Sequence, residues 1–516
     1  MYTYNEGCVF NSLDDIKGKN ITVMGLGLNG GGLATVRFFL KYGAFVTVTD
    51  MKTEEQLASS IDALSKDEEV CKSRLKYVLG CHRLEDFENA DCVIKNPGIK
   101  IEGNKYLAAA RAIETDISIF LHFSKAPIIA VTGSKGKSST VSALHYGLNK
   151  AGFTCFLGGN ITVSPLSFLE QTNENTPVVL ELSSWQLADL RGRKALKPFI
   201  AIITKIVPDH LNWYGNMYDY IADKRLIYAD QTKDDYTIID YDGDEMGSSP
   251  CDCIDGKSGY DAHKTWGDLF AAETKGTVLR YTRGSVLENA FGVYQENGDA
   301  GFEGKVILEG EKTPVTILKN LAVPGEHAKI NVLNAALVMY LMKVPPEHII
   351  TIMGDWQGVA HRLQFFYSYK NVRFFNDSCA TVPEASSAAS QAFGKPVILI
   401  TGGTDKGLSF DVLVKTLSAK GSDAVAPKAL YFLSGTGTDK VIPELDKNGV
   451  NYYGPYSNLD GLLFDLKKNL ELKKEIFENG DDEIVVFSPG ATSFGMFANE
   501  FDRGNQFMDR VKAIFH

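Results

Sequence analysis

The stretch Ile128-Ile-Ala-Val-Thr-Gly-Ser-Lys-Gly-Lys-Ser-Ser-Thr140 joins an apolar strand directly to a glycine-rich turn. Backbone N–H groups in such a turn, and at the N-terminus of the helix that follows it, point at phosphate oxygens. Lys137 adds a positive charge, and the Ser138 hydroxyl is a ligand for Mg²⁺. The strict P-loop pattern has a glycine five residues before Gly136, where this chain has Val131. The stretch predicts binding of ATP or GTP, and the alternative is an ordinary strand-to-helix turn.

Length and composition exclude several classes of protein. A chain of 516 residues is typical of about three domains, and 44% hydrophobic content is enough for several buried cores. The net charge of −11 and the lack of any Lys/Arg block disfavour nucleic acid as a ligand. Eight dispersed cysteines favour reduced thiols, and no run of about 18 apolar residues or basic leader is present. We therefore expect a soluble, cytoplasmic protein that does not insert into a membrane. Separately, we expect a monomer whose partners are small molecules.

A second glycine-rich turn lies near the N-terminus. The predicted strand Asn20–Met24 is followed by Gly25-Leu-Gly-Leu-Asn-Gly30, a helical pattern and a second strand, Phe45–Asp50. This is a Rossmann-type β-α-β unit, and Asp50 lies 20 residues after the last glycine, where a carboxylate reaches a ribose hydroxyl. The turn therefore predicts a second nucleotide site. The alternative is a tight β-α turn with Asp50 as a solvated strand end.

Apolar strands alternating with helical patterns along the rest of the chain predict an α/β fold with three domains. We expect residues 1–117 to form a Rossmann-like domain, 118–358 a central P-loop-type ATPase domain, and 359–516 a C-terminal Rossmann-like domain. Residues 242–310 differ, because they are rich in Gly, Asp and Ser. We expect a loop-bearing β segment there without a metal, since Cys251-Asp-Cys253 lacks a second pair at zinc spacing.

Three further polar residues follow predicted strands near the phosphate loop. Glu181 ends the strand Val178–Leu182, where a carboxylate is well placed to hold Mg²⁺. Without the phosphate loop it would be interpreted as a solvated strand end. His210 follows another strand and Lys224 lies on an amphipathic helical pattern, but such residues are more often structural or solvated.

The motifs taken together resemble the Mur ligases over nearly the whole chain. They are Thr132-Gly-Ser-Lys-Gly-Lys-Ser138, Leu180-Glu-Leu-Ser-Ser-Trp-Gln-Leu187, Asp209-His-Leu-Asn-Trp-Tyr214 with Lys224, Gly325-Glu-His-Ala-Lys-Ile-Asn331, His361-Arg362 and Asn376-Asp-Ser-Cys-Ala-Thr381. Within that family, the second motif and the N-terminal glycine turn look like the members that add D-glutamate to UDP-N-acetylmuramoyl-L-alanine. The resemblance implies ATP-dependent amide formation through an acyl phosphate, in peptidoglycan precursor synthesis.

The resemblance also implies a role for individual residues. The residues it places at ATP are Gly133, Ser134, Lys135, Gly136, Lys137, Ser138, Ser139, Asn331, Arg362 and Asp377. Those it places at Mg²⁺ are Ser138, Glu181, His210 and Lys224, the last as a lysine carbamylated by CO₂; Lys137, His210 and Lys224 are the implied catalytic residues. Those it places around the UDP-sugar are Leu28, Asn29, Asp50, Asn96, Gly98 and Asn160, and those at D-glutamate are Thr381, Lys406 and Ser493.

Three positions depart from the family pattern. Cys379 stands where many members have lysine, Asn212 replaces an aspartate, and Ala328 replaces an asparagine. Three alternatives follow from the sequence: a nicotinamide-dependent oxidoreductase built on the first glycine turn, a catalytically silent nucleotide-binding homologue, for which Cys379 is the best support, and a Mur-type ligase for another amino acid.

Overall fold

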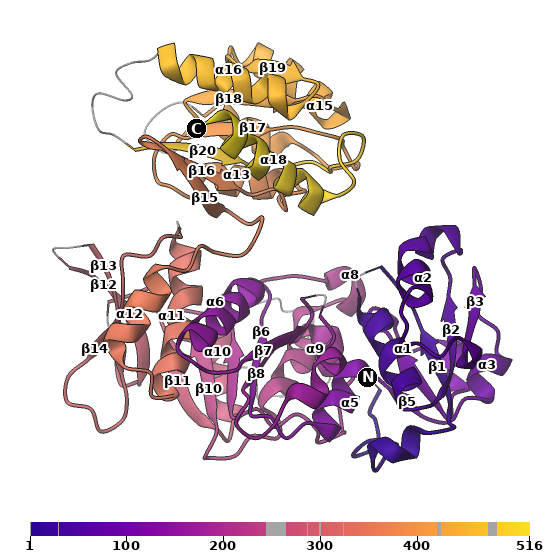
Figure 1. Ribbon diagram of the computed structural model, residues 1–516. Helices are drawn as coiled ribbons and strands as arrows, with labels where there is room; N and C mark the ends of the chain where they lie inside the picture. Colours follow the sequence, from indigo (N-terminus) through magenta and orange to yellow (C-terminus); the bar gives the residue numbers. More distant parts are fainter. Residues whose placement is uncertain are drawn as a thin grey trace. The chain divides into compact units, whose positions relative to one another are not determined.

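The structure is a computed structural model that describes residues 2–28, 30–161, 163–243, 265–285, 287–298, 301–323, 325–419, 425–472 and 482–516. The chain separates into two compact units. The first comprises Met1–Lys319 with Ile330–Ile352, and the second comprises Asn320–Lys329 with Met353–His516 (Figure 1). Asn29 and the Cys251-Asp-Cys253 segment lie outside the described residues.

The first sheet belongs to the N-terminal part of the first unit, and all its strands are parallel. Its order is β3 (Leu75–Leu79), β2 (Phe45–Asp50), β1 (Asn20–Met24), β4 (Cys92–Lys95) and β5 (Ile113–Glu114). Its helices are α1 (Gly31–Lys41), α2 (Ala58–Ser65), α3 (Glu85–Glu88), α4 (Lys105–Ala108) and α5 (Asp116–Phe123). The strand order reverses direction between β1 and β4, which is where ligands bind in open α/β sheets.

The second sheet carries the phosphate loop. Its order is β14 (Val315–Lys319), β13 (Gly301–Ile307), β12 (Gly292–Gly298), β11 (Thr277–Tyr281), β10 (Tyr236–Asp240), β9 (Ile200–Ile203), β6 (Ile128–Thr132), β8 (Val178–Glu181) and β7 (Phe156–Gly159). The strands from β7 to β12 pair in parallel, whereas β13 and β14 are antiparallel. Its helices are α6 (Lys137–Lys150), α7 (Ser184–Ala188), α8 (Leu211–Tyr214), α9 (Met217–Lys224), α10 (Trp266–Glu273), α11 (Glu326–Leu341) and α12 (Pro346–Gly354).

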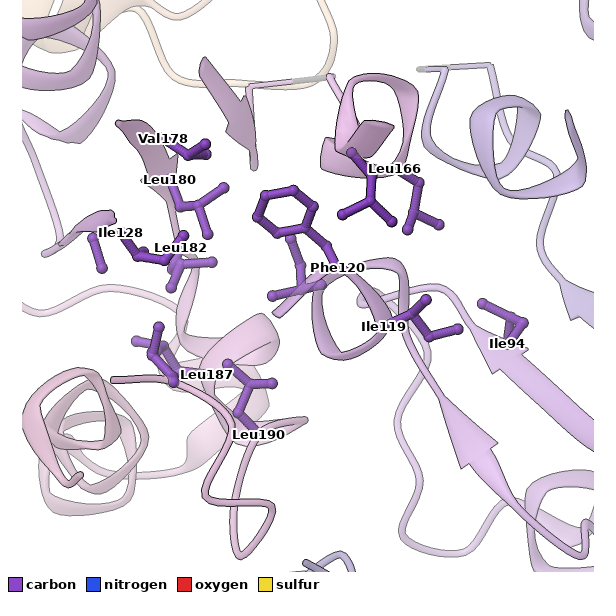
Figure 2. Close-up of a cluster of buried hydrophobic side chains, with 14 of the residues drawn as sticks. Ile94, Ile119, Phe120, Ile128, Leu166, Val178, Leu180, Leu182, Leu187 and Leu190 are labelled. Carbon is purple, nitrogen blue, oxygen red and sulfur yellow. The ribbon is translucent and has the colours of Figure 1, made fainter. Parts of the chain in front are cut away.

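One hydrophobic core runs through both sheets of the first unit. Figure 2 shows Ile119 and Phe120 of α5 between Ile94 of β4 and the side chains of β8. The residues it labels are Ile94, Ile119, Phe120, Ile128, Leu166, Val178, Leu180, Leu182, Leu187 and Leu190. Phe120 is fully buried, and burying such a side chain contributes about 1.5–3 kcal/mol. Helix α5 therefore joins the two sheets through apolar packing.

The third sheet lies in the second unit. Its order is β15 (Gln364–Tyr369), β16 (Val372–Asn376), β20 (Glu483–Phe487), β17 (Ile398–Thr401), β18 (Ala429–Leu433) and β19 (Tyr453–Tyr456), with only β15 antiparallel to its neighbour. Its helices are α13 (Pro383–Gln391), α14 (Asp411–Leu417), α15 (Thr436–Lys447), α16 (Leu459–Leu472) and α18 (Glu500–Ile514). Strand β20 lies between β16 and β17, so the loops that follow these three strands are neighbours.

The three parallel-rich sheets confirm the α/β fold predicted from the sequence. The domain boundaries near residues 117 and 358 stay predictions. The expectation of a loop-bearing β segment over 242–310 was wrong in one part, because α10 forms at Trp266–Glu273. Its N-cap Thr265 accepts a hydrogen bond from the Asp268 N–H, a signal that the Gly- and Asp-rich surroundings obscured. Among the described residues, no helix has the length and apolar character needed to cross a membrane.

Candidate active site

Close packing around two glycines shapes the phosphate loop between β6 and α6. Gly133 (φ +143°) and Gly136 (φ +96°) adopt backbone conformations that favour glycine. A Cβ on Gly133 would lie 2.0 Å from Thr204 Oγ1, and one on Gly136 would lie 2.5 Å from Asn331 Oδ1. The loop is therefore pressed against both β9's end and α11. This contact brings Asn331, predicted to bind ATP, to the phosphate loop.

Polar contacts fix the rest of the loop. Ser134 Oγ donates to the Val207 carbonyl at 2.8 Å, and Lys135 forms an exposed ion pair with Asp209 at 3.1 Å. Lys137 Nζ donates to the Gly133 and Ser134 carbonyls at 2.9 and 3.2 Å. The residues of this loop predicted to bind ATP, Gly133, Ser134, Lys135, Gly136, Lys137, Ser138 and Ser139, therefore lie together at the start of α6.

Glu181 lies at the carboxyl end of β8, directly beside the strand that leads into the loop. Its side chain is 1% exposed, which is inconsistent with a solvated strand end. Oε1 accepts a hydrogen bond from Asn160 Nδ2 at 2.9 Å, whereas Oε2 is buried and has no hydrogen-bond partner among the residues that the structure describes. An unpartnered buried carboxylate oxygen is costly unless a ligand completes it. This oxygen fits Mg²⁺, which needs one or two carboxylates in addition to phosphate and water oxygens.

No group of three or more His, Cys, Asp or Glu side chains suited to a metal ion occurs in the part of the chain that the structure describes. A Mg²⁺ ion here would therefore take most of its ligands from phosphate and water, with Glu181 and the Ser138 hydroxyl from the protein. His210 adopts a left-handed conformation (φ +54°) before α8 and its side chain is 45% exposed. Its ring lies 5.0 Å from the Trp185 ring.

Lys224 is buried at the end of α9, with only 1% of its surface exposed. Its Nζ donates to the Gly133 carbonyl at 2.8 Å and lies 4.6 Å from the centre of the Tyr220 ring. Within the described residues it forms no ion pair. Burial, and next the charge of Lys137, hold the pKa of the Lys224 amine well below its usual range. The structure therefore places the buried Lys224 amine against the phosphate loop. This is inconsistent with the alternative from the sequence, that Lys224 is a solvated helix residue.

The N-terminal glycine turn forms one wall of a cavity of about 720 Å³ at the point where the first sheet's strand order reverses. Gly25 of this turn lines it, together with Asp50, Asn96 and Gly98, which were predicted around the UDP-sugar. Leu28 is not among the lining residues and is 53% exposed.

The cavity includes residues that the sequence did not single out. His82, Lys52, Lys105 and Tyr106 also line it. His82 lies edge-on against Tyr106, and burial lowers its pKa. No local pattern marks these side chains, because Lys52, His82 and the start of α4, which carries Lys105 and Tyr106, are far apart in the sequence and meet only in the fold. Asp50 already accepts hydrogen bonds from the Gly27 and Lys52 N–H groups, so it shapes the turn as well as the cavity.

The second unit holds the remaining predicted residues. Asp377 accepts hydrogen bonds from Ser488 Oγ at 2.7 Å and from the Leu363 N–H at 3.1 Å, and burial raises its pKa to about 6. Arg362 and Lys406 are exposed, Thr381 is half-buried and Ser493 is buried. Cys379 is half-buried, and its N–H donates to the His361 carbonyl. Asp377, Thr381 and Ser493 follow the neighbouring strands β16 and β20.

Two buried ion pairs were also missed. Lys95 pairs with Asp189 and Arg193 pairs with Glu114, each at 2.8 Å and each joining the first sheet to the segment after α7. The N-terminal segment runs across this junction, because the Tyr4 N–H donates to the Arg191 carbonyl and the Gly7 N–H to that of Arg193. Sequence reasoning missed these pairs because their partners are far apart along the chain.

Comparisons with known proteins agree with this arrangement. Residues 131–339 match the model of the Mur ligase middle domain, and residues 19–119 match that of the Mur ligase MurD-like N-terminal domain. The chain is 38% identical to the "UDP-N-acetylmuramoylalanine--D-glutamate ligase" of Treponema pallidum, over 97% of this chain and 98% of that protein. It is 37% identical to the protein of the same name from Borreliella afzelii, over 97% and 99%. The chain belongs to the Mur ligase family.

Among solved structures, the chain is similar to UDP-N-acetylmuramate-alanine ligase MurC from Thermotoga maritima. The TM-score is 0.53 and the identity 16%, over 96% of this chain and 99% of that one. At that identity the likeness concerns the fold. The first-sheet cavity and the phosphate loop of this Mur ligase thus lie within the parts that the two family models match.

Proposed function

We propose that this Mur ligase uses ATP to join D-glutamate to UDP-N-acetylmuramoyl-L-alanine through an acyl phosphate. The observation that carries the proposal is the arrangement at the phosphate loop, where a buried lysine and an unpartnered buried carboxylate oxygen flank a glycine cradle. The full-length relatives named for this reaction support the choice of substrates. Peptidoglycan precursor synthesis would be the setting of such a reaction.

In the first step, an oxygen of the substrate carboxylate attacks the γ-phosphorus of ATP, and ADP leaves. The loop amides and Lys137 are placed to neutralise charge on the transferring phosphoryl group. Glu181 and Ser138 would hold Mg²⁺, which would offset the negative charge of the phosphate oxygens. In the second step the amine of D-glutamate attacks the acyl carbon, inorganic phosphate leaves, and the amine loses a proton.

Lys224 has a role in this scheme as a carbamate. A neutral lysine amine attacks CO₂ and releases one proton, which replaces the neutral amine with a carboxylate-like anion. Burial favours the neutral amine, and the resulting anion would face the loop that binds Mg²⁺ and phosphate. With His210, this anion would help to hold a second Mg²⁺ near the acyl phosphate.

The remaining substrates have predicted positions. The first-sheet cavity is large enough for a nucleoside diphosphate, and Asp50, Asn96 and Gly98 line it. Asn160, whose amide donates to Glu181, would contact the UDP substrate from beside the proposed metal ligand. Thr381, Lys406 and Ser493 would hold the D-glutamate carboxylates, while Arg362 and Asp377 would contact ATP.

The test is phosphate release from ATP in the presence of UDP-N-acetylmuramoyl-L-alanine while the amino acid is varied. We expect turnover with D-glutamate and none with L-glutamate, D-aspartate or L-lysine. Lys137→Met should abolish turnover, whereas Lys150→Met, at the exposed end of the same helix, should not change it. Turnover with a different amino acid would instead indicate a Mur-type ligase of another specificity.

A catalytically silent homologue would bind ATP without turnover with any amino acid. In that case Cys379→Lys, which restores the residue common in the family, is the variant to measure next. Carbamylation of Lys224 is tested by Lys224→Ala, whose activity should partly return with formate or acetate, since a small carboxylate then replaces the carbamate. No rescue, together with full wild-type activity in CO₂-depleted buffer, would contradict the carbamate.

A further inference from the structure

Arg503 is a buried cation without an acidic partner. It lies in the first turn of α18, only 1% of its surface is exposed, and it forms no ion pair within the described residues. Burial lowers its pKa to about 10, so the guanidinium stays charged at neutral pH. A buried charge is costly unless it is fully hydrogen-bonded, and in proteins it is normally paired. The position therefore needs an explanation beyond filling the core.

The guanidinium instead bonds to two loops of the second unit. Nε donates to Ser378 Oγ at 3.0 Å and Nη2 to the Ser378 carbonyl at 2.8 Å. Nη1 donates to the Ala491 carbonyl at 3.0 Å. Ser378 Oγ in turn donates to the Glu500 carbonyl at 2.7 Å, which ties the same loop to the start of α18. The planar fork therefore fixes the separation between the loop after β16 and the loop after β20.

A third loop closes over the same group. Gly403, in the loop after β17, has φ +146°, and a Cβ there would lie 3.8 Å from Arg503 Nη1 and 2.8 Å from the Thr492 carbonyl oxygen. Thr404 and Thr492 exchange backbone hydrogen bonds at 3.3 and 3.0 Å. The three loops that meet at Arg503 thus follow three adjacent strands, β16, β20 and β17.

The residue after Arg503 shows how closely α18 approaches this site. A Cβ on Gly504 would lie 2.1 Å from His361 Nδ1 and 2.9 Å from Asn376 Nδ2. Only glycine leaves room for His361 and Asn376, and the close contact holds the first turn of α18 under the loops. Arg503 and Gly504 therefore act together. The glycine lets α18 approach His361 and Asn376, and the arginine donates the hydrogen bonds to the two loops.

We infer that Arg503 is a positioning residue that holds the three loops at the separation needed to bind the amino-acid substrate, a compact dicarboxylate. This inference rests on the proposed function, since the three loops carry Thr381, Lys406 and Ser493. Arg503 itself lies behind the Ser378 and Ala491 carbonyls and acts through these loops. Sites of this kind lose much of their affinity when their supporting groups are loosened, because ligating side chains must hold to within about 0.5 Å.

The test is Arg503→Lys, which keeps the charge and removes the fork. We expect the KM for the amino acid to rise about tenfold or more, while the KM for the UDP substrate changes less than about twofold, because that cavity lies in the first unit. The matched control is Arg510→Lys on the same helix, whose arginine is 37% exposed and pairs with Asp460 at the surface. It should leave both KM values unchanged. A lower Tm with both KM values unchanged would overturn the inference, as would an equal rise in both.

Ser378→Ala provides a second, milder variant if Arg503→Lys does not fold. It removes the Oγ that accepts from Arg503 and donates to Glu500, but keeps the Ser378 carbonyl. We expect a rise of about three- to fivefold in the KM for the amino acid only. An unchanged KM in a folded Ser378→Ala protein would count against the inference.

Hydrogen exchange separates this inference from the proposed function. In the substrate-free protein, either folded variant should speed amide exchange over residues 377–381 and 489–493, with no change in the first-sheet cavity. If the wild type shows no turnover with D-glutamate, the proposed function fails while the exchange result still decides the role of Arg503. Unchanged exchange in these segments would overturn that role.

Discussion

Two regions of the first unit bury basic side chains in opposite ways. At the junction between its two sheets, Lys95 and Arg193 are 2% and 3% exposed, and each contacts a buried carboxylate at 2.8 Å. At the phosphate loop, Lys224 is equally buried but donates to a backbone carbonyl and forms no ion pair within the described residues. Nearby, an oxygen of Glu181 has no partner.

The two regions differ in the partner that each buried ionisable side chain has. At the junction the protein supplies both signs, so each charge lies beside an opposite charge before any ligand arrives, and the pairs hold the two sheets together. At the phosphate loop, Lys224 has no ion-pair partner and Glu181 Oε2 has no hydrogen-bond partner among the described residues, and such perturbed groups cluster where ligands or chemistry complete them. Burial of a charge alone therefore does not distinguish a structural residue from a functional one; the identity of its partner does.

The largest expected effect comes from breaking one junction pair. Arg193→Met leaves Glu114 buried and without its cation, and should lower the free energy of unfolding by about 3–5 kcal/mol. Urea denaturation measures this change. The matched control is Arg37→Met, since Arg37 contacts Asp67 at 2.6 Å but is 43% exposed, and it should cost about 0–1 kcal/mol. The double variant Arg193→Met/Glu114→Gln should cost less than Arg193→Met alone. A loss below about 1 kcal/mol for Arg193→Met would contradict the claim that the junction ion pairs stabilise the fold.

A second prediction sets the two buried lysines against each other. Lys224→Met removes a buried amine that has no carboxylate partner within the described residues, so the free energy of unfolding should change by less than about 1 kcal/mol. Turnover should nevertheless fall by about 10²–10³-fold, because the amine that forms the proposed carbamate is lost. Lys95→Met should do the reverse, with about 3 kcal/mol lost in stability and kcat/KM within a few-fold of wild type. Equal stability losses in the two variants would contradict the distinction.

The sequence predicts these two regions unequally, for a physical reason. The phosphate loop could be predicted because its strand, glycines and lysine lie within 13 consecutive residues. Strands such as Asn20–Met24 and Phe45–Asp50 were predicted with the observed bounds, because apolar runs bounded by turn residues are local signals. The domain boundaries and the roles of the site residues stay predictions.

The junction could not be predicted, because Lys95 and Asp189 are 94 positions apart and only the tertiary fold brings them together. The same holds for His82 in the first-sheet cavity and for Arg503. The burial of Lys224 was also out of reach, since its helix has an amphipathic pattern with the lysine at its end. Local patterns thus predict elements and loops, whereas the partner that decides the role of a buried charge comes from elsewhere in the chain.

The smallest expected effect is a pH dependence at the junction. Burial raises the pKa of Asp189 to about 6, although Lys95, Tyr4 and Arg193 each act to lower it. The native carboxyl therefore takes up a proton more readily than the unfolded one, whose pKa is about 3.9. Between about pH 4 and pH 6 the native state binds more protons at this site. The contribution of Asp189 to stability should therefore fall as the pH rises through that window, by at most about 3 kcal/mol, and stay constant above it.

Urea denaturation of wild type and Asp189→Asn across pH 4–7 isolates this contribution, because other titrating groups are common to both proteins. The difference in free energy of unfolding between them should slope between pH 4 and 6 and be flat at pH 6–7, whatever its absolute size. Asp62→Asn is the control, since Asp62 is 66% exposed and pairs with Lys66 on the same helix turn; its difference from wild type should show little slope. A slope of the opposite sign for Asp189→Asn would mean that Lys95 stabilises the charged carboxylate more than burial opposes it. Coulombic attraction between Lys95 and Asp189 would then outweigh the cost of burying the two charges. The junction would differ in this respect from Lys224, whose burial favours the neutral amine.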